Sequence, residues 1–415
     1  MKVFCQSPAL KRIASLTLIA GITLSSLSLP AAAEIEKVFY LDATGVQVTA
    51  DAAGHYVYIP DQKHQRLLIV DSTTLEEVAS IALPGQPQDI ALDEQQQRAY
   101  VTVEGINQVI VIDLTNNALL DPIALPQPGY EIEVSDYDIF VTTYGNGSGI
   151  MRIEKSTYTF FGMFSEGVLT YQRGAIELTP DNSRLIFANR GVSPGTLAVF
   201  DITSDSPNLL IKNAHGDLGG NGQAISVDPI AGDFVSYAVG GGNGPGYTIA
   251  KLDIDTLSWL GEFNTGAYPR AVHHSLDGHS TYTNNSADEV KVWDNTLMTQ
   301  SDSFEVNGDP KDFADLQAGA LLAVISNEEF AIYQVGDLTQ EPQAPKLAGE
   351  LTGAMAYRTV CINQTTGQRV IIKDTLHEFD CVRAGLNINA NDDVRINIRA
   401  SIEENGRTTT RTHQQ

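Results

Sequence analysis

The stretch that decides the fold is Arg66-Leu67-Leu68-Ile69-Val70-Asp71, which returns as Gln108-Val109-Ile110-Val111-Ile112-Asp113 at an offset of 113 − 71 = 42 residues. At the same offset, Ile81-Ala82-Leu83-Pro84 returns as Ile123-Ala124-Leu125-Pro126. Alternating and β-branched residues between turn-forming residues indicate short strands. A repeat of this period indicates one supersecondary unit, no copy of which can bury its faces alone.

Each copy is predicted to contain four short strands. The first strand carries an apolar marker that can be followed through seven copies: Val46, Ile90, Ile132, Ile176, Ile225, Val272 and Phe313. The third strand ends on an acid that we expect to cap the next turn; these acids are Asp71, Asp113, Glu154, Asp201, Asp253 and Asp294, with Val335 at the seventh position. Seven four-stranded units predict an all-β fold, a seven-bladed β-propeller.

The N-terminal part of the repeat region suggests how this ring closes. Residues 36–41, Glu-Lys-Val-Phe-Tyr-Leu, precede the first copy, whereas the seventh copy ends after Tyr333. Pairing this stretch into the last blade as its fourth strand would join both ends of the chain and protect the edge of the sheet. A loose N-terminal arm is the alternative, since termini often fray.

Three motifs resemble the YVTN-repeat family of β-propellers: Tyr100-Val101-Thr102-Val103, Val109-Ile110-Val111-Ile112-Asp113 and Thr179-Pro180-Asp181. The resemblance covers about residues 35–335 and implies the fold. It implies no single function, because the family includes surface-layer proteins, lactonase-like enzymes and redox-enzyme subunits. The chain departs from the family pattern in blades three to five, where glycine-rich loops lengthen the repeat.

The first 33 residues resemble a secretory signal. Lys2, Lys11 and Arg12 precede an apolar run from Ile13 to Leu29, and small residues end the segment at Ala33. This pattern predicts cleavage after Ala33 and a periplasmic or secreted protein. A retained membrane anchor is the alternative, although hydroxyl side chains interrupt the apolar run.

A second domain is expected after the propeller, which spans residues 34–338. A linker at 339–346 leads to a small β-sandwich-like domain at 347–403, similar to modules on other exported bacterial proteins, and a mobile tail at 404–415. After signal cleavage the chain keeps Cys361 and Cys381. An oxidising compartment predicts a disulfide between them, worth about 3 kcal/mol; two unpaired buried thiols are the alternative.

Composition excludes several classes of function. Lys and Arg number 26 against 51 Asp and Glu, for a net charge of -25, which argues against sequence-independent nucleic-acid binding. After the first thirty residues no apolar stretch is long enough to predict a membrane span. We find no G-x-S-x-G, H-E-x-x-H or C-x-x-C-H motif, so we expect no cofactor or metal site, and binding is favoured over catalysis.

Glycine-rich loops between the second and third strands of blades three to five are the first candidate site. Their backbone N–H groups could hold an anion or a sugar at the mouth of the channel; wide turns are the alternative. The candidate binding residues of these loops are Asn146, Arg190 and Asn243, and His215 lies in the long loop that enters blade five.

Charged residues near the innermost strands are the second candidate site. Those that enter the strands are Asp89, Glu131, Arg173, Arg270 and Lys311, and Gln223 occupies the same position in blade five. Within the strands lie Glu133, Glu177, His273 and His274. A glutamate within hydrogen-bond reach of His273 could support acid–base chemistry. A structural ring of ion pairs between blades is the alternative.

Three functions follow from this pattern, none of which names a ligand. The first is an exported propeller that binds a small molecule, a glycan or a protein at the channel-mouth face. The second is a lyase or lactonase acting on a sugar acid, in which Arg173, Arg270 and Lys311 hold a carboxylate and His273 moves a proton. The third is a non-catalytic subunit of a periplasmic redox complex.

Overall fold

The computed structural model describes residues 35–414 apart from 145–148, 169–172, 205, 215–217, 242–246, 286, 337–347, 351–355, 364, 366–367, 375–377, 381–393 and 405–406. The predicted signal segment and the linker at 339–346 lie outside these residues and stay predictions. No helix of the described part is long and apolar enough to cross a bilayer.

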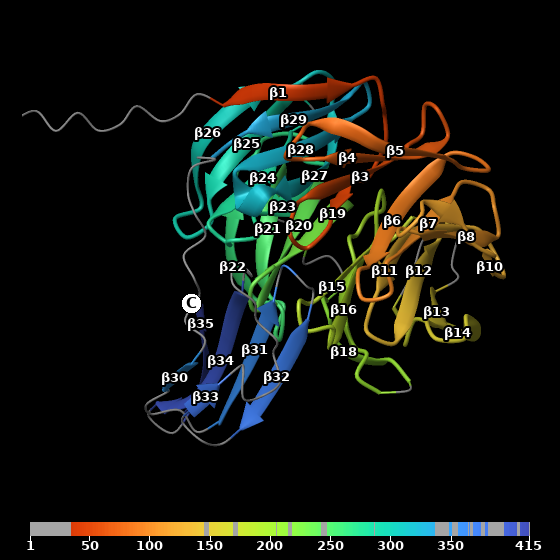
Figure 1. Ribbon diagram of the computed structural model, residues 1–415. Helices are drawn as coiled ribbons and strands as arrows, with labels where there is room; N and C mark the ends of the chain where they lie inside the picture. The colour runs from red at the N-terminus through yellow and green to blue at the C-terminus, as the bar shows by residue number, and fades with distance from the viewer. Residues whose placement is uncertain are drawn as a thin grey trace, which may run out of the picture. The chain divides into compact units, whose positions relative to one another are not determined.

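Seven antiparallel sheets follow one another along the chain, which confirms the predicted seven-bladed propeller (Figure 1). From the channel outward, blade one contains β2 (Thr49–Ala50), β3 (Tyr56–Asp61), β4 (Arg66–Asp71) and β5 (Glu76–Ala82). Blade two contains β6 (Pro87–Asp93), β7 (Arg98–Val103), β8 (Gln108–Asp113) and the short strands β9 (Ala118–Leu119) and β10 (Ile123–Ala124). Blade three contains β11 (Gly129–Val134), β12 (Asp138–Thr143), β13 (Ile150–Glu154) and β14 (Thr159–Phe164).

The other four blades have the same order of strands. Blades four and five contain β15 (Ala175–Leu178), β16 (Arg184–Ala188), β17 (Leu197–Asp201) and β18 (Asn208–Lys212), then β19 (Gly220–Val227), β20 (Phe234–Gly241), β21 (Tyr247–Asp253) and β22 (Trp259–Phe263). Blades six and seven contain β23 (Val272–His274), β24 (Ser280–Thr283), β25 (Glu289–Asp294) and β26 (Thr299–Glu305), then β27 (Pro310–Leu316), β28 (Leu321–Ser326), β29 (Phe330–Gln334) and β1 (Glu36–Leu41).

The ring closes as the sequence predicts. Strand β1 pairs antiparallel with β29, from Glu36 opposite Gln334 to Leu41 opposite Phe330. Figure 1 shows β1, in red, beside β29 in the sheet that also contains β28 and β27. Blade seven is therefore built from both ends of the propeller segment, and opening the ring requires breaking this ladder.

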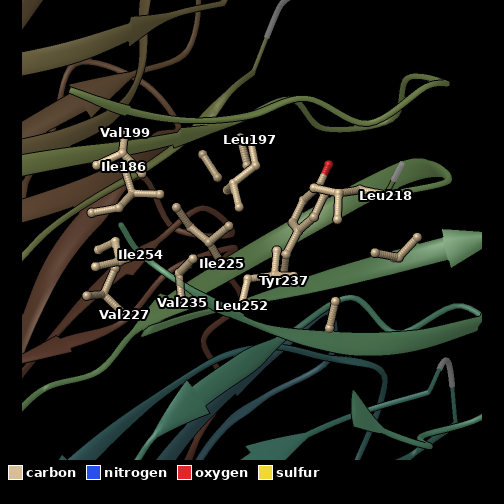
Figure 2. Close-up of a cluster of buried hydrophobic side chains, with 14 residues drawn as sticks. Ile186, Leu197, Val199, Leu218, Ile225, Val227, Val235, Tyr237, Leu252 and Ile254 are labelled. Carbon is tan, nitrogen blue, oxygen red and sulfur yellow. The ribbon is translucent and has the colours of Figure 1, made fainter. Parts of the chain in front are cut away.

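The core lies between neighbouring blades, and each of the seven interfaces has its own cluster of buried apolar side chains. Between blades four and five, Ile186 and Val199 pack against Ile225, Tyr237 and Leu252 (Figure 2). Burying one such aliphatic or aromatic side chain contributes about 1.5–3 kcal/mol. Each blade thus depends on both of its neighbours, as expected for a closed repeat.

The acids that end the third strands are turn formers, as predicted. Strands β4, β8, β13, β17, β21 and β25 end on the six acids named above. Asp71 Oδ1 accepts hydrogen bonds from the amides of Thr73 and Thr74 at 2.7 and 3.0 Å. Asp294 Oδ1 does the same for Thr296 and Leu297 at 2.8 and 2.7 Å.

One strand marker is wrong. Six of the seven lie in the innermost strands, but β2 comprises only Thr49–Ala50, so Val46 lies outside it. The Val48 amide donates to an acid of the preceding blade, as the Ile132 and Ile176 amides do. Val48 is therefore the equivalent residue. A period of two cannot distinguish Val46 from Val48, because both positions point to the same face of a strand.

The C-terminal domain contains a four-stranded antiparallel sheet, with the order β32-β31-β34-β35. Its strands are β31 (Ala356–Asn363), β32 (Arg369–Asp374), β34 (Val394–Glu404) and β35 (Arg407–Gln414), and β30 (Ala348–Glu350) pairs separately with β33 (Glu378–Asp380). Alternation in the sequence at 357–362, 368–373 and 394–399 predicts three of these strands, which correspond to β31, β32 and β34. A sandwich of two packed sheets stays a prediction.

Residues 407–414 of the predicted tail form β35, which pairs with β34; the mobility of the tail stays a prediction. The sequence analysis gave weight to the polarity of this segment and overlooked its four threonines, which are β-branched and favour strands. Cys381 lies outside the described residues, so its disulfide with Cys361 stays a prediction.

Candidate functional site

Alternation along the innermost strands places two sets of ionisable side chains around the channel. Alternate residues of a strand point to the same face, so the positions just before and just after each apolar marker both face the axis. We call the set before the markers the first ring, which consists of Asp89, Glu131 and Asp312. We call the set after the markers the second ring, which consists of Glu133, Glu177 and His273. All six residues line one cavity of about 270 Å³.

The first ring joins neighbouring blades. Each of its carboxylates accepts a hydrogen bond from a backbone amide of the next blade, in the same geometry each time. The contacts run from Ile132 N to Asp89 Oδ2 at 2.7 Å, from Ile176 N to Glu131 Oε2 at 2.8 Å and from Val48 N to Asp312 Oδ2 at 2.9 Å. Charge-assisted bonds of this kind are stronger than neutral ones, so this ring supports the structural interpretation of the channel charges.

Glu131 also carries the main ion pair of the channel. Its carboxylate pairs with Arg190, whose guanidinium donates to the Tyr130 hydroxyl at 3.2 Å. Gln47 Nε2 donates to Glu131 Oε1 at 3.3 Å. Burial raises the pKa of Glu131 to about 7, although Arg190 acts to lower it. Arg190, a predicted binding residue, thus has a structural partner.

The second ring contains carboxyl groups with few partners. Glu133 makes no hydrogen bond within the described part of the chain, and the charged groups that act on it are Asp89, Glu177 and Glu131. Burial, followed by these like charges, raises the pKa of Glu133 well above its ordinary value. Burial likewise raises the pKa of Glu177 to about 8, although its hydrogen bond from the Val227 amide acts to lower it.

His273 pairs with a carboxylate that the sequence analysis did not name. Its Nε2 lies 2.9 Å from Asp315 Oδ2, which also accepts from the Leu276 amide at 3.0 Å. Burial alone would lower the pKa of His273, but the hydrogen bond and charge of Asp315 raise it. No hydrogen bond joins His273 to Glu133 or Glu177 in the described chain, so the catalytic role of these residues stays a prediction.

His274 has a different environment from its neighbour. It is buried, with Nδ1 2.8 Å from Thr281 Oγ1 and Nε2 2.9 Å from Ser236 Oγ. Burial lowers the pKa of His274 well below its ordinary value. A neutral imidazole held between two hydroxyl groups of the blade interface supports the structure of blades five and six.

Cations gather at the mouth of the channel, around a second cavity of about 480 Å³. Its charged and aromatic lining consists of Arg173, Arg190, Arg270, Lys311, Tyr130 and Tyr268, joined by Gln223. Arg270 and Lys311 share one carboxylate, since both lie within 2.7 Å of Asp309 Oδ2. Arg173 packs its guanidinium 4.4 Å from the centre of the Tyr144 ring and makes no ion pair with a described residue.

The backbone holds two of these side chains in an uncommon conformation. Arg173 and Tyr268, which precede the innermost strands of blades four and six, have φ values of 58° and 57°. Residues other than glycine rarely adopt this left-handed region, and such residues cluster at binding and active sites. The Arg173 amide donates to Thr143 O at 2.9 Å, which fixes the turn that carries it.

The glycine-rich loops are only partly described. Asn146, Asn243 and His215 lie outside the described residues, and their binding roles stay predictions. In the loop of blade four, the amides of Gly191 and Gly195 donate to Gly222 O and Gly219 O, both at 2.7 Å. These two amides are therefore occupied by the neighbouring segment, which favours the interpretation of this loop as a turn.

Close packing explains some of these glycines. The Tyr237 hydroxyl donates to Asn189 O at 3.0 Å, and a Cβ atom on Gly222 would lie 1.6 Å from that hydroxyl oxygen. A Cβ atom on Gly195 would lie 2.8 Å from it. Glycine is required here because a tyrosine from blade five reaches the loop of blade four.

The structure brings most of the predicted site residues together and adds others. Arg173, Arg270 and Lys311 line one cavity at the mouth, and their role in binding stays a prediction. Sequence analysis missed Asp312, Asp315, Tyr130 and Tyr268. Asp312 had a signal, since it stands before the marker Phe313 as Asp89 stands before Ile90 and Glu131 before Ile132.

Comparisons with known proteins identify the fold alone. No protein-family model matches the chain, and no curated protein matches it either. Among solved structures, the chain is similar to Kuenenia stuttgartiensis hydrazine synthase, with a TM-score of 0.55 and 15% sequence identity over 72% of this chain and 97% of that chain. At this identity the likeness supports the propeller and carries no function to this chain.

Proposed function

We propose that the chain is an exported β-propeller that binds a small anionic molecule, such as a sugar acid, at the mouth of its channel. One observation carries the proposal: four cations line the mouth cavity of a chain whose net charge is -25. Among the described residues, the carboxylates that pair with them are Asp309 and Glu131. An acidic protein that concentrates its cations around one concave site has a local potential suited to anions.

The other groups at the mouth suit a carboxylated sugar. A guanidinium such as that of Arg173 or Arg270 can hold a carboxylate through two parallel hydrogen bonds. The rings of Tyr130 and Tyr268 offer an apolar face with a polar tip. A cavity of about 480 Å³ also falls within the range of about 300–1,000 Å³ that is typical of small-molecule sites.

Export belongs to the same proposal. It is supported by the basic, apolar and small-residue sections of residues 1–33 and by the resemblance to the YVTN-repeat family, which includes surface-layer proteins. Sequencing the N-terminus of the protein from the periplasmic fraction should give Glu34 first. Recovery of the full chain from the cytoplasm would contradict export.

Calorimetry with D-glucuronate tests the binding function, with D-glucose as the uncharged control. We expect glucuronate to bind at least tenfold more tightly than glucose, and Arg173→Gln to reduce the glucuronate affinity about tenfold. Lys212→Gln, on the outermost strand of blade four, is the matched control and should leave the affinity unchanged. Equal binding of both sugars, or no binding of glucuronate, would overturn the proposal.

Lactone hydrolysis or lyase chemistry on a sugar acid is the second candidate. His273 favours it, because the imidazole lines the cavity and is oriented by Asp315 at 2.9 Å. Such a histidine could take a proton from water or from a substrate carbon. Turnover of a uronate lactone by the wild-type chain, lost in His273→Gln, would support this function over simple binding.

A further inference from the structure

The mouth cavity and the deeper cavity are neighbours whose linings differ in charge. Arg190 and Lys311 line both of them. Above them lie Arg173 and Arg270, and on the inner side the cavity is lined by five carboxyl groups of the two rings. A molecule held by its anionic end at the mouth therefore directs its other end toward carboxyl groups.

Two of the acids in the deeper cavity have carboxyl oxygens without a hydrogen-bond partner. Glu133 lines the cavity and is half-buried, and its carboxyl group makes no hydrogen bond with any described residue. Asp315 is 3% exposed, and its Oδ1 is buried without a hydrogen-bond partner, while Oδ2 holds His273. Buried polar atoms are nearly always hydrogen-bonded in folded proteins, so each such atom needs an explanation.

The charges around Glu133 indicate which kind of group would bind its carboxyl group. Asp89, Glu131 and Glu177 all act on this carboxyl group with the same sign, and no cation does. An uncompensated buried carboxylate is costly, and a hydrogen-bonded cation is what offsets that cost. A cation that enters from the mouth would supply both the charge and the donors.

We propose that the ligand of the channel is a small zwitterion, an amino sugar acid, whose carboxylate lies against Arg173, Arg270 and Lys311 and whose ammonium group reaches Glu133 and Glu177. This inference rests on the proposed function and adds the second charge of the ligand. An ammonium group offers three N–H donors in a compact volume. The sugar hydroxyls would lie between Tyr130 and Tyr268 at the mouth.

An organic cation fits the cavity better than a metal ion does. No cluster of three or more His, Cys, Asp or Glu side chains with the geometry of a metal site occurs among the described residues. The carboxylates of the first ring already accept bonds from backbone amides, which fixes them in place. An ammonium group needs only a few acceptors in no fixed coordination geometry.

Three matched probes test the inference: D-glucuronate, D-glucosamine, and 2-amino-2-deoxy-D-glucuronate, which carries both charges. Calorimetry at pH 6.5 should give an affinity for the amino uronate at least tenfold higher than for either single-charge sugar. Equal affinities for glucuronate and the amino uronate would overturn the inference that the ligand is a zwitterion. They would not contradict the proposed binding of an anionic molecule. No binding of any of the three would overturn both.

Glu133→Gln tests the proposed contact with the ammonium end of the ligand separately from the contacts with its carboxylate. It should reduce the affinity for the amino uronate about tenfold and leave the affinity for glucuronate unchanged. Asp113→Asn, on the outer part of blade two, is the matched acid-to-amide control and should change neither affinity. An unchanged affinity of Glu133→Gln for the amino uronate would overturn the role given to this residue.

Proton release gives an independent readout. At pH 6.5 the raised pKa of Glu177, about 8, keeps this acid largely protonated, so an arriving ammonium group should displace a proton. The groups that face this cavity are Asp89, Glu131, Glu133, Glu177, Asp312, Asp315, His273, Arg190 and Lys311. Calorimetry in two buffers of different ionisation enthalpy should show proton release with the amino uronate and none with glucuronate. Proton uptake with the amino uronate would contradict the inference.

Discussion

The two rings of the channel differ although they come from the same strands. Glu131 and Glu133 are two positions apart in β11 and both face the axis, yet Glu131 holds Arg190 and the Ile176 amide, whereas Glu133 makes no hydrogen bond within the described chain. In blade three the position before the marker meets the backbone of the next blade, whereas the carboxyl group after it has no such contact and lines the cavity. In this blade a shift of two residues therefore separates a structural carboxylate from one that is available to a ligand.

The largest expected effect comes from breaking the first ring at its ion pair. Glu131→Ala leaves the Arg190 guanidinium without its carboxylate partner and the Ile176 amide without an acceptor. Removing one partner of a buried ion pair typically costs about 3–5 kcal/mol. We expect a loss of this size in the free energy of unfolding, measured by urea denaturation.

The matched control for this variant is Asp113→Ala. That acid accepts from the Thr115 amide at 2.9 Å in an exposed turn, so its removal should lower the free energy of unfolding far less than removal of Glu131 does. If both variants lost the same small amount, the first ring would have no special structural role.

The dependence of stability on pH comes next in size. Burial raises the pKa of Glu177 to about 8 from its ordinary value of 4.5, so the folded chain binds more protons than the unfolded chain between these values. The free energy of unfolding should therefore fall as pH rises, by up to about 1.4 kcal/mol per pH unit in this window. The raised pKa values of Glu131, Asp312 and His273 act in the same direction.

Urea denaturation between pH 5.5 and 7.5 measures this slope, with a total decrease of about 2–3 kcal/mol expected from Glu177 alone. Glu177→Gln removes the titrating group and should make the profile flatter. A free energy that rises with pH over this range would show that Glu177 is ionised at low pH in the folded chain.

The sequence predicted the fold because each blade repeats the same local rules. Alternation located the strands, the acids at the ends of the third strands located the turns, and residues 36–41 had the pattern of a missing fourth strand. These signals are local, so they can be recognised in the sequence without knowledge of the contacts between blades. The strand at 407–414 was missed because the segment is polar and because its partner, β34, is needed to define it.

Removing a single link of the first ring has a smaller expected effect. Asp312→Ala leaves the Val48 amide, which joins blade seven to blade one, without its acceptor. Leaving a buried donor without its partner costs about 1–3 kcal/mol. Part of this cost is offset because the variant no longer has to bury the Asp312 carboxyl group, whose pKa burial raises to about 6. We expect a loss of about 1–2 kcal/mol in urea denaturation. Asp312→Asn keeps an acceptor oxygen, so its free energy of unfolding should fall less than that of Asp312→Ala. A larger decrease for Asp312→Asn than for Asp312→Ala would contradict this role.

The site was less predictable than the fold because its members meet only in space. The sequence placed Arg173, Arg270 and Lys311 near the channel, since all three lie just before or at the start of an innermost strand. It could not show that Asp309 serves both Arg270 and Lys311, or that Asp315 rather than a glutamate holds His273. These pairings depend on side-chain reach between strands and blades, which the repeat does not encode.

The smallest loss of stability should come from the second ring. Glu133→Gln replaces a half-buried carboxyl group, which makes no hydrogen bond within the described chain, by a neutral group of the same shape. Because the raised pKa of Glu133 makes the folded chain less stable as pH rises, the free energy of unfolding of this variant should not fall and should rise most at high pH. Urea denaturation at pH 7.5, where ionisation of the acid is most costly, is the most sensitive measurement. A loss of more than about 2 kcal/mol would mean that Glu133 holds the blades together as Glu131 does, and the distinction between the two rings would fail.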